Sequence, residues 1–429
     1  MNFEILHPRD QIVTIMERIY HGEMTTISGG NLSILDDNGD LWITPAGIDK
    51  GKLTAADIIC VHEDGSMEGP HKPSSEYPFH RAIYEKRPDL RAIVHAHPPA
   101  IVAYSIAGIA PDTHIIPQAN AICGPIGIAP YAIPGSEELG MNIADTLSEG
   151  YNMVILENHG LVAGGHSLLA AFQRMETLDF CARTFIHARR LGEPRLLTAA
   201  QLNLFSSRQH YLPEFILNKH TSRELELRQK MVEIVHRACQ RRLMISTEGV
   251  ISTRIDQESF LITPTGADRR GLSVEDIVLV RSGCREAGKI PSRSVLLHQQ
   301  IYQDHPDIHC VITAQSPHAA AYAVTEVAFD TKTIPESYIL LRDVPRVPFN
   351  TLYSKPHEVS VAISNTTPVL LIENDCVLTV GKTILQAFDR LEVLEYTAMS
   401  LLNAQKLGTF KPIGEKEIED IVEKFLSQD

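Results

Sequence analysis

The sequence contains no cysteines in C-x-x-C spacing and no segment that approaches the roughly 18 consecutive apolar residues of a membrane span. Its seven cysteines are scattered and odd in number, so we expect neither a disulfide framework nor a cysteine-based zinc site. The first residues, MNFEILHPRDQ, lack the basic and then apolar pattern of a signal peptide. These absences predict a cytoplasmic protein with no membrane partner.

Positive charge is also scarce, because 39 Lys and Arg residues stand against 53 Asp and Glu residues, for a net charge of −14. This balance argues against nucleic acid as a partner, and any phosphate that binds must be held by a local pocket. The hydrophobic fraction of 44% is typical of a soluble globular protein. A chain of 429 residues is too long for one ordinary core, so we expect two domains.

The two halves of the sequence repeat each other. FHRAIYEKRPDL from Phe79 recurs 218 residues later as LHQQIYQDHPDI from Leu297. ITPAGI recurs as ITPTGA, and AAFQRMETLDF recurs as QAFDRLEVLEY, at nearly the same offset. Offsets this steady predict two copies of one domain. We place the first copy at residues 1–205, a linker at 206–222 and the second copy at 223–429.

Within the first copy, patterns typical of helices and strands alternate. The sequence predicts a helix at about residues 8–20 and short strands in NLSILDD and LWITPAG. Ser75 is the expected N-cap of a helix that ends near residue 87, and RAIVHAH reads as a buried strand. YNMVILENHG is a further apolar strand, followed by a long helix that stops at Gly192. Helices around a sheet predict an α/β or α+β sandwich.

A pair of histidines in AIVHAHPPA indicates a metal site. On a strand, His95 and His97 project to the same side, so their imidazoles converge. An H-x-H pair also arises by chance in a chain with 19 histidines. His159 is a third candidate at the end of a strand, where we expect Gly160 to permit a sharp turn. Three histidines from two strands match the open pattern of a catalytic zinc.

Polar residues at one predicted helix start complement the histidines. Glu76 lies in KPSSEYP, where the helix dipole favours a carboxylate, although taken alone a simple first-turn acid that helps the helix start is the default interpretation. Ser74 and Ser75 offer hydroxyls and free first-turn amides to an anion. SGGNLS can add further amides and the Asn31 side chain, or be a plain turn.

Taken in order, SGGNLS, ITPAG, PSSE, HAHP and NHG resemble the class II aldolase/adducin family, and within it the zinc-dependent L-fuculose-phosphate-type aldolases. The resemblance covers the first copy and, more faintly, the second. It implies an α/β three-layer sandwich for both copies and one Zn²⁺ per chain in the first. It also implies Glu76 as the catalytic acid/base. The implied zinc ligands are His95, His97 and His159, and the implied phosphate-binding residues, with Gly30 nearby, are Asn31, Gly47, Ser74 and Ser75.

The activity implied by the resemblance is cleavage of a small phosphorylated ketose to dihydroxyacetone phosphate and an aldehyde, in which zinc stabilises an enediolate. Sugar-phosphate epimerases and decarboxylases of phosphorylated sugar acids share the fold and remain alternatives. Relatives of the epimerase type usually carry Asp where this chain has Glu76, which favours the other two. A non-catalytic adducin-like binding module is the remaining alternative, and it suits the second copy better than the first.

Two departures from the family pattern stand out in the first copy. Ala46 occupies a position where many relatives carry a hydroxyl residue. The segment HIIPQANAICG contains no tyrosine, whereas the aldolases of the family take a proton donor from it. Both departures concern substrate handling rather than the metal.

The second copy has lost the candidate site. The offsets carry the three histidines, then Glu76, Ser75 and Asn31, to Thr313, Gln315, Asp375, Ser294, Arg293 and Val250. Relatives assemble as fourfold rings, so we expect a homo-oligomer, a dimer whose four domains form a pseudo-tetramer. A second role for this copy is to lend Tyr338, which falls opposite Asn120, as a proton donor to a neighbouring site.

Overall fold

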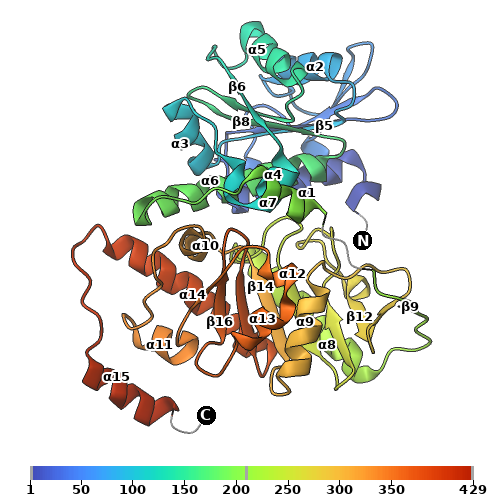
Figure 1. The fold of residues 1–429 in the computed structure, drawn as a ribbon. Helices are drawn as coiled ribbons and strands as arrows, with labels where there is room; N and C mark the ends of the chain where they lie inside the picture. The colour runs from blue at the N-terminus through green and yellow to red at the C-terminus, as the bar shows by residue number, and fades with distance from the viewer. Residues whose placement is uncertain (1–2, 208–210, 427–429) are drawn as a thin grey trace. The chain divides into compact units, whose positions relative to one another are not determined.

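The computed structural model describes residues 3–207 and 211–426 (Figure 1). By its internal contacts the chain divides into unit 1, Met1–Thr113 and Gln118–Arg183, and unit 2, His114–Pro117 and Thr184–Asp429. Residues 208–210 of the predicted linker lie outside the described residues. The remainder of that linker includes the short strand β9 (Glu214–Phe215), which pairs with the sheet of unit 2.

Unit 1 contains one eight-stranded sheet in the order β4-β3-β2-β1-β5-β8-β7-β6. Its neighbouring strands are antiparallel except for the parallel pair β6 and β7. The strands are β1 (Asn31–Leu35), β2 (Leu41–Ile43), β3 (Ile59–Val61), β4 (Met67–Glu68), β5 (Ala92–Ala96), β6 (Ile126–Ala129), β7 (Met153–Leu156) and β8 (Gly160–Gly165).

Helices cover both faces of this sheet (Figure 1). Phe79 and Ile83 of α2 and Ile143 of α5 pack with Ile93 and Val154 of the strands on one face. Helix α1 contacts β1 and β2 on the other. The helices are α1 (Pro8–His21), α2 (Tyr77–Lys86), α3 (Pro99–Ala107), α4 (Pro117–Cys123), α5 (Glu137–Ser148) and α6 (Leu168–Leu191), with short helices η1 (Phe3–Ile5), η2 (Lys50–Lys52), η3 (Ala55–Asp57) and η4 (Thr113–Ile115). The α/β three-layer sandwich is thereby confirmed.

Unit 2 repeats this architecture with one additional edge strand, in the order β9-β13-β12-β11-β10-β14-β17-β16-β15. Its other strands are β10 (Val250–Arg254), β11 (Ser259–Ile262), β12 (Val278–Arg281), β13 (Cys284–Glu286), β14 (Cys310–Ala314), β15 (Arg346–Val347), β16 (Val369–Ile372) and β17 (Val377–Gly381). Its helices are α7 (Ala199–Ser206), α8 (Ser222–Gln240), α9 (Val295–Asp304), α10 (Pro317–Ala323), α11 (Pro335–Leu341), α12 (Thr351–Ser354), α13 (Pro356–Val361), α14 (Ile384–Ala404), α15 (Glu415–Ile421), η5 (Val274–Asp276) and η6 (Val422–Leu426).

Strand register confirms the duplication residue by residue. In unit 1, Ser33 pairs with Ile43 and Asn31 pairs with His95. In unit 2, the corresponding pairs are Ser252 with Ile262 and Val250 with Thr313. The sequence offsets therefore identify structurally equivalent positions in the two copies.

A buried hydrogen-bond network recurs in both units. The Ser33 hydroxyl of β1 lies 2.7 Å from His80 Nδ1 and 2.7 Å from the Tyr84 hydroxyl, both in α2. In unit 2, Ser252, His298 and Tyr302 repeat the arrangement with the same distances. Because both copies keep this network although only one keeps the histidine triad, its common role is to join helix to sheet.

One predicted helix boundary is wrong. Helix α2 begins at Tyr77, so its N-cap is Glu76 rather than Ser75, and the Glu76 side chain makes no capping hydrogen bond. Ser75 is exposed. The carboxylate of Glu76 is directed to other partners across the sheet, which a pattern of neighbouring residues does not reveal.

Among the described residues, no helix combines the length and apolar character needed to cross a membrane.

Candidate metal and acid–base site

The three predicted ligand histidines lie together in unit 1. His95 is in β5, His97 directly follows that strand, and His159 lies in the turn between β7 and β8. One ring nitrogen of each lies within 4.8 Å of the others. The Nε2 atoms of His95 and His97 are 3.1 Å apart. Strand alternation thus brings the pair to one point, as predicted, and the adjacent antiparallel hairpin supplies the third ring.

The expected role of Gly160 is wrong in one respect. The left-handed residue of the turn is Asn158, with φ of 53°, whereas Gly160 starts β8. A Cβ added at Gly160 would lie 2.5 Å from His97 Cδ2 and 2.7 Å from the Ala96 carbonyl oxygen. Glycine is therefore needed for the close approach of His97 to this backbone and not for the turn itself.

Burial keeps the His95 and His97 imidazoles neutral. Desolvation, with a smaller contribution from His159, lowers the pKa of His95 to about 3. Desolvation and then the neighbouring histidines lower the pKa of His97 to about 3. His95 Nδ1 lies 2.9 Å from the Leu161 carbonyl oxygen and must donate to it, since a carbonyl can only accept. The Nε2 lone pair of His95 is therefore directed at the other histidines, as a metal ligand requires.

Glu76 completes the cluster from the start of α2. Its carboxylate is buried, with Oε2 3.3 Å from His95 Nε2 and Oε1 3.8 Å from His159 Nε2. Asn31 Nδ2 donates to Oε2 at 2.6 Å. Oε1 is buried and has no hydrogen-bond partner among the described residues. A buried oxygen without a partner beside this cluster of imidazoles calls for a cation or a proton.

These residues fit a divalent metal ion. The triad offers three imidazole nitrogens, and the Glu76 carboxylate lies at its edge rather than within it. Three protein ligands with room for another are the arrangement of a catalytic zinc. The structure therefore carries a candidate three-histidine metal site in the first copy.

Asn31 belongs to this cluster more closely than the predicted phosphate role suggests. Its amide nitrogen donates to Glu76 and its oxygen contacts His80 Nε2. The side chain thus holds the Glu76 carboxylate in place from β1. A phosphate contact through its second N–H stays a prediction.

The other predicted phosphate residues lie on two adjoining segments. The Ser74 N–H donates to the Thr44 carbonyl at 3.1 Å, and the Ala46 N–H donates to the Lys72 carbonyl at 2.9 Å. Ser74 is buried and its hydroxyl accepts from the Glu76 N–H at 3.3 Å. Ser75 and Gly47 are exposed. The structure thus brings these residues to the start of α2, and their role in binding phosphate stays a prediction.

Lys50 is a buried cation near the predicted phosphate residues that the sequence patterns did not single out. Its side chain is 3% exposed, Nζ donates to the Pro45 carbonyl, and desolvation lowers its pKa to about 8. In unit 2, Arg269 donates to the Pro264 carbonyl at 3.0 Å. The signal was available, because a cation follows both ITPAG and ITPTG at the same spacing.

The described residues of unit 2 show no equivalent site. Thr313, Gln315 and Asp375 occupy the positions of the three histidines, and no metal-binding group of side chains is found there among the described residues. Ser294 replaces Glu76, and its hydroxyl lies 3.1 Å from that of Ser292. Because Val250 replaces Asn31, the buried Nε2 of His298 has no hydrogen-bond partner among the described residues. The strand register supports this correspondence of positions, since Asn31 pairs with His95 as Val250 pairs with Thr313.

Tyr338, the suggested proton donor, lies half-buried in α11 of unit 2, with Arg342 over its ring at 5.8 Å. Its catalytic role stays a prediction.

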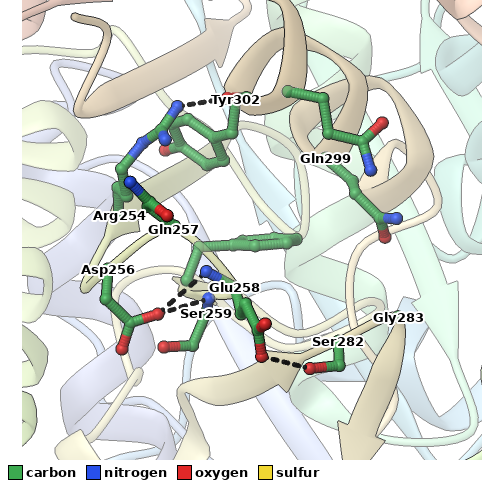
Figure 2. Close-up of a pocket in the computed structure, with 11 residues that line it drawn as sticks. Arg254, Asp256, Gln257, Glu258, Ser259, Ser282, Gly283, Gln299 and Tyr302 are labelled. Carbon is green, nitrogen blue, oxygen red and sulfur yellow. Dashed lines mark hydrogen bonds between the residues drawn. The ribbon is translucent and has the colours of Figure 1, made fainter. Parts of the chain in front are cut away.

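Unit 2 also contains a pocket of about 360 Å³ beside the β10–β11 hairpin (Figure 2). The polar groups that line it largely satisfy one another. Arg254 donates to the Tyr302 carbonyl, and Glu258 accepts from the Ser282 hydroxyl at 2.9 Å. Asp256 accepts from two backbone N–H groups at 2.9 Å. These contacts stabilise the hairpin and indicate no particular ligand.

Comparison with known proteins agrees with this architecture. The family described as Class II Aldolase and Adducin N-terminal domain matches residues 10–186 and 229–402, one match in each copy. A 5-deoxy-D-ribulose 1-phosphate aldolase from Bacillus thuringiensis is 34% identical over 195 residues, 44% of this chain and 89% of that protein.

Two other relatives have different activities. A 3-oxo-tetronate 4-phosphate decarboxylase from Pectobacterium atrosepticum is 35% identical over 179 residues, 41% of this chain and 82% of that protein. An L-fuculose phosphate aldolase from Escherichia coli is 34% identical over 168 residues, 39% of this chain and 77% of that protein. Each of these relatives is about as long as a single copy.

Proposed function

Because the chain belongs to the class II aldolase and adducin family, we propose that its first copy is a zinc-dependent lyase that cleaves a small phosphorylated ketose to dihydroxyacetone phosphate and an aldehyde. The observation that carries the proposal is the convergence of His95, His97 and His159 beside the buried Glu76 carboxylate. The aldolases among the relatives support the choice of reaction.

The three imidazole nitrogens of the triad would hold the ion. When bound there, Zn²⁺ supplies Lewis-acid stabilisation of the negative charge that builds up on substrate oxygens, an effect of several kcal/mol. Desolvation keeps His95 and His97 unprotonated, so a proton competes poorly for the same lone pairs.

Glu76 is the group that moves the proton. Its Oε1 has no hydrogen-bond partner among the described residues, so this oxygen is free to take a proton from substrate or return it. Asn31 donates to the other oxygen, Oε2, and thereby fixes which oxygen faces the reaction. One oxygen of the carboxylate is thus held while the other is available for proton transfer.

The substrate phosphate is held beside Glu76 at the start of α2. The donors offered there are the Ser74 and Ser75 hydroxyls and the Ser75 and Gly47 N–H groups, because the Ser74 and Ala46 N–H groups already donate to the Thr44 and Lys72 carbonyls. Ala46 removes one hydroxyl from this set, so backbone donors carry more of the contact. Binding of this unreactive end orients the carbon that reacts.

Replacing Glu76 with Gln tests the proposal. We expect the E76Q variant to keep its metal and to lose turnover by about 10²–10⁴-fold, because the amide cannot accept the proton. The matched control is E85Q, an exposed position on the same helix, which should be fully active. Normal turnover in E76Q would remove Glu76 from the mechanism.

A decarboxylase is the second candidate, because the relative from Pectobacterium atrosepticum is as similar as the aldolases. Assays on phosphorylated ketoses and on phosphorylated 3-oxo sugar acids separate the two activities. Release of an aldehyde supports the lyase proposal, and release of carbon dioxide supports the decarboxylase. A phosphorylated pentulose converted to its epimer would support the epimerase. Absence of both metal and turnover would leave the binding-module alternative.

We propose that the second copy serves as a structural partner of the first copy in the oligomer. We expect a dimer, hence a mass of twice the 47.6 kDa chain in light scattering, with four domains in a pseudo-tetramer. A monomer would contradict this expectation. Tyr338 is the candidate proton donor from this copy, and unchanged turnover in Y338F would exclude that role.

A further inference from the structure

A second group of ligand-type side chains lies at one edge of the unit 1 sheet. Asp40 directly precedes β2, Cys60 is in β3 and His62 directly follows β3. Strand register pairs Leu41 with Val61 and Trp42 with Cys60, which places Asp40 opposite His62. Cys60 and His62 are two residues apart and therefore share one face of the sheet.

The potential ligand atoms of these three residues lie within 4.8 Å of one another. His62 Nδ1 is 2.9 Å from Asp40 Oδ1 and 3.9 Å from Cys60 Sγ. Among the described residues, the Asp40 carboxylate and the Cys60 thiol have no side-chain hydrogen-bond partner other than His62. Asp36, an acid in the same turn, instead accepts from backbone N–H groups and from Trp42 Nε1.

Glu68 orients the imidazole for coordination. Its Oε1 lies 3.4 Å from His62 Nε2, on the other side of the ring from Asp40 and Cys60. A carboxylate that accepts from Nε2–H leaves the Nδ1 lone pair for a metal, a common arrangement around metal-binding histidines. Without a metal, His62 Nδ1 and Asp40 Oδ1, 2.9 Å apart, share a hydrogen-bonded proton, and a cation bound to both atoms takes the place of that proton.

The surroundings favour a cation. Cys60 is 1% exposed, and the acids Asp40, Glu68 and Asp36 act on it with negative charge, opposed by Arg9. The same negative potential attracts a divalent ion, which binds the thiolate and displaces its proton.

The second copy shows that the fold does not require this group. Its equivalent positions carry Ser259, Leu279 and Arg281. Unit 2 stabilises this edge differently, with a two-residue turn at Ser282 and Gly283, both at positive φ, and with the extra strand β9. Unit 1 has a longer β3–β4 connection and its sheet ends at β4.

We propose that Asp40 Oδ1, Cys60 Sγ and His62 Nδ1 form a second metal site, which binds Zn²⁺ and joins the β1–β2 and β3–β4 hairpins at the edge of unit 1. Carboxylate, thiolate and imidazole are all zinc ligands, and a water completes the four-coordinate geometry. The site shares no residue with the histidine triad and serves stability rather than turnover. A single cysteine between distant partners gives no spacing signal, which is why a cysteine-containing zinc site was not expected.

Cobalt substitution tests this site in the intact protein. We expect metal-free wild-type protein to bind two Co²⁺ per chain and to show thiolate-to-cobalt charge-transfer absorption in the near ultraviolet. The histidine triad contains no thiolate and gives no such band. C60S, D40N and H62Q should each bind one Co²⁺ and lose the band, whereas the double variant H95A/H97A should bind one and keep it.

Matched controls make the result decisive. C284S changes a half-buried cysteine of unit 2 and should leave both the band and the stoichiometry unchanged. D40N and H62Q alter partly exposed side chains, so they test the site even where the buried C60S substitution disturbs folding. A saturated wild-type protein without the band, or a band that survives in D40N and H62Q, overturns the proposal. C60S should keep full turnover, so this outcome is independent of the proposed lyase activity.

Discussion

Asn31 connects the hydrogen-bond network found in both copies to the carboxylate found only in the first. Its oxygen contacts His80, which belongs to the shared network, and its amide nitrogen donates to Glu76. In unit 2 the equivalent residue is Val250, so the network ends at the unpartnered Nε2 of His298. At the scale of single residues, the site is thus built by extending a scaffold network by two side chains.

Removing the central hydroxyl of this network separates its two roles. S33A and S252A each remove the partner of a buried histidine nitrogen and one hydrogen bond of a tyrosine hydroxyl, although Tyr84 keeps its bond to the Ser33 carbonyl, and each should lower the free energy of unfolding by about 1–3 kcal/mol. Only S33A should also lower kcat/KM, because only His80 leads to Glu76 through Asn31. Urea unfolding and steady-state kinetics on both variants check this. An equal kinetic loss in S252A would contradict it.

The buried histidine of the second copy makes stability depend on pH. Desolvation lowers the pKa of His298 from 6.5 to about 3. Below pH 6.5 the unfolded chain binds a proton that the folded chain refuses, so stability falls as the pH drops towards 3. The contribution is at most about 1.4 kcal/mol per pH unit.

We expect H298N to flatten this pH dependence while lowering stability at neutral pH, measured as urea unfolding at several pH values. H309N, at an exposed position, is the control and should retain the wild-type slope. A slope unchanged in H298N would show that other groups dominate acid unfolding.

At the scale of elements, local sequence patterns predicted the type of each helix and strand but missed the contacts that a segment makes with neighbouring segments. The strand with its histidine pair and the long helix before Gly192 were predicted correctly, because alternation and apolar periodicity are local. The N-cap of α2 was misplaced because Glu76 is directed at Asn31 and His95, residues far away in the sequence. The role of Gly160 was misjudged for the same reason, since the constraint comes from His97 on the neighbouring strand.

The start of β8 offers a direct test of that constraint. The methyl group in G160A would overlap His97 Cδ2 and the Ala96 carbonyl, so the imidazole must move from the triad. We expect a loss of metal affinity of roughly 10–100-fold, the usual effect of disturbing the shell that positions a ligand. G192A is the matched control, because its added methyl group meets only Val327 at 3.7 Å. Titration with a competing chelator measures both, and equal affinities would contradict the argument.

At the scale of the whole chain, the internal repeat predicted two copies of one fold and the loss of ligands in the second. Equivalent strand pairs confirm that alignment, since Asn31–His95 corresponds to Val250–Thr313. Contacts that arise only from strand register could not be predicted from the sequence. Asp40 and His62 are an example, because they are far apart in sequence but lie opposite each other at the ends of two neighbouring strands. Sequence motifs were therefore enough to locate the histidine triad, whereas the proposed site at Asp40, Cys60 and His62 could be recognised only from the pairing of the strands.

The unequal copies predict that metal stabilises one part of the chain. A ligand that binds only the folded state stabilises it by about 2.7 kcal/mol at a hundredfold excess over its dissociation constant. We expect added Zn²⁺ to slow amide hydrogen exchange in peptides containing His95, His97 and His159, but not in those containing Thr313, Gln315 and Asp375. H95A/H97A should abolish the protection at the triad while leaving the β2–β3 peptides protected by Cys60. Equal protection of the unit 2 peptides in the wild type would contradict this expectation. Metal bound only in unit 1 cannot slow local exchange in a unit that contains no metal ligand. Such a result would therefore show that other side chains of unit 2 bind metal in place of the histidines.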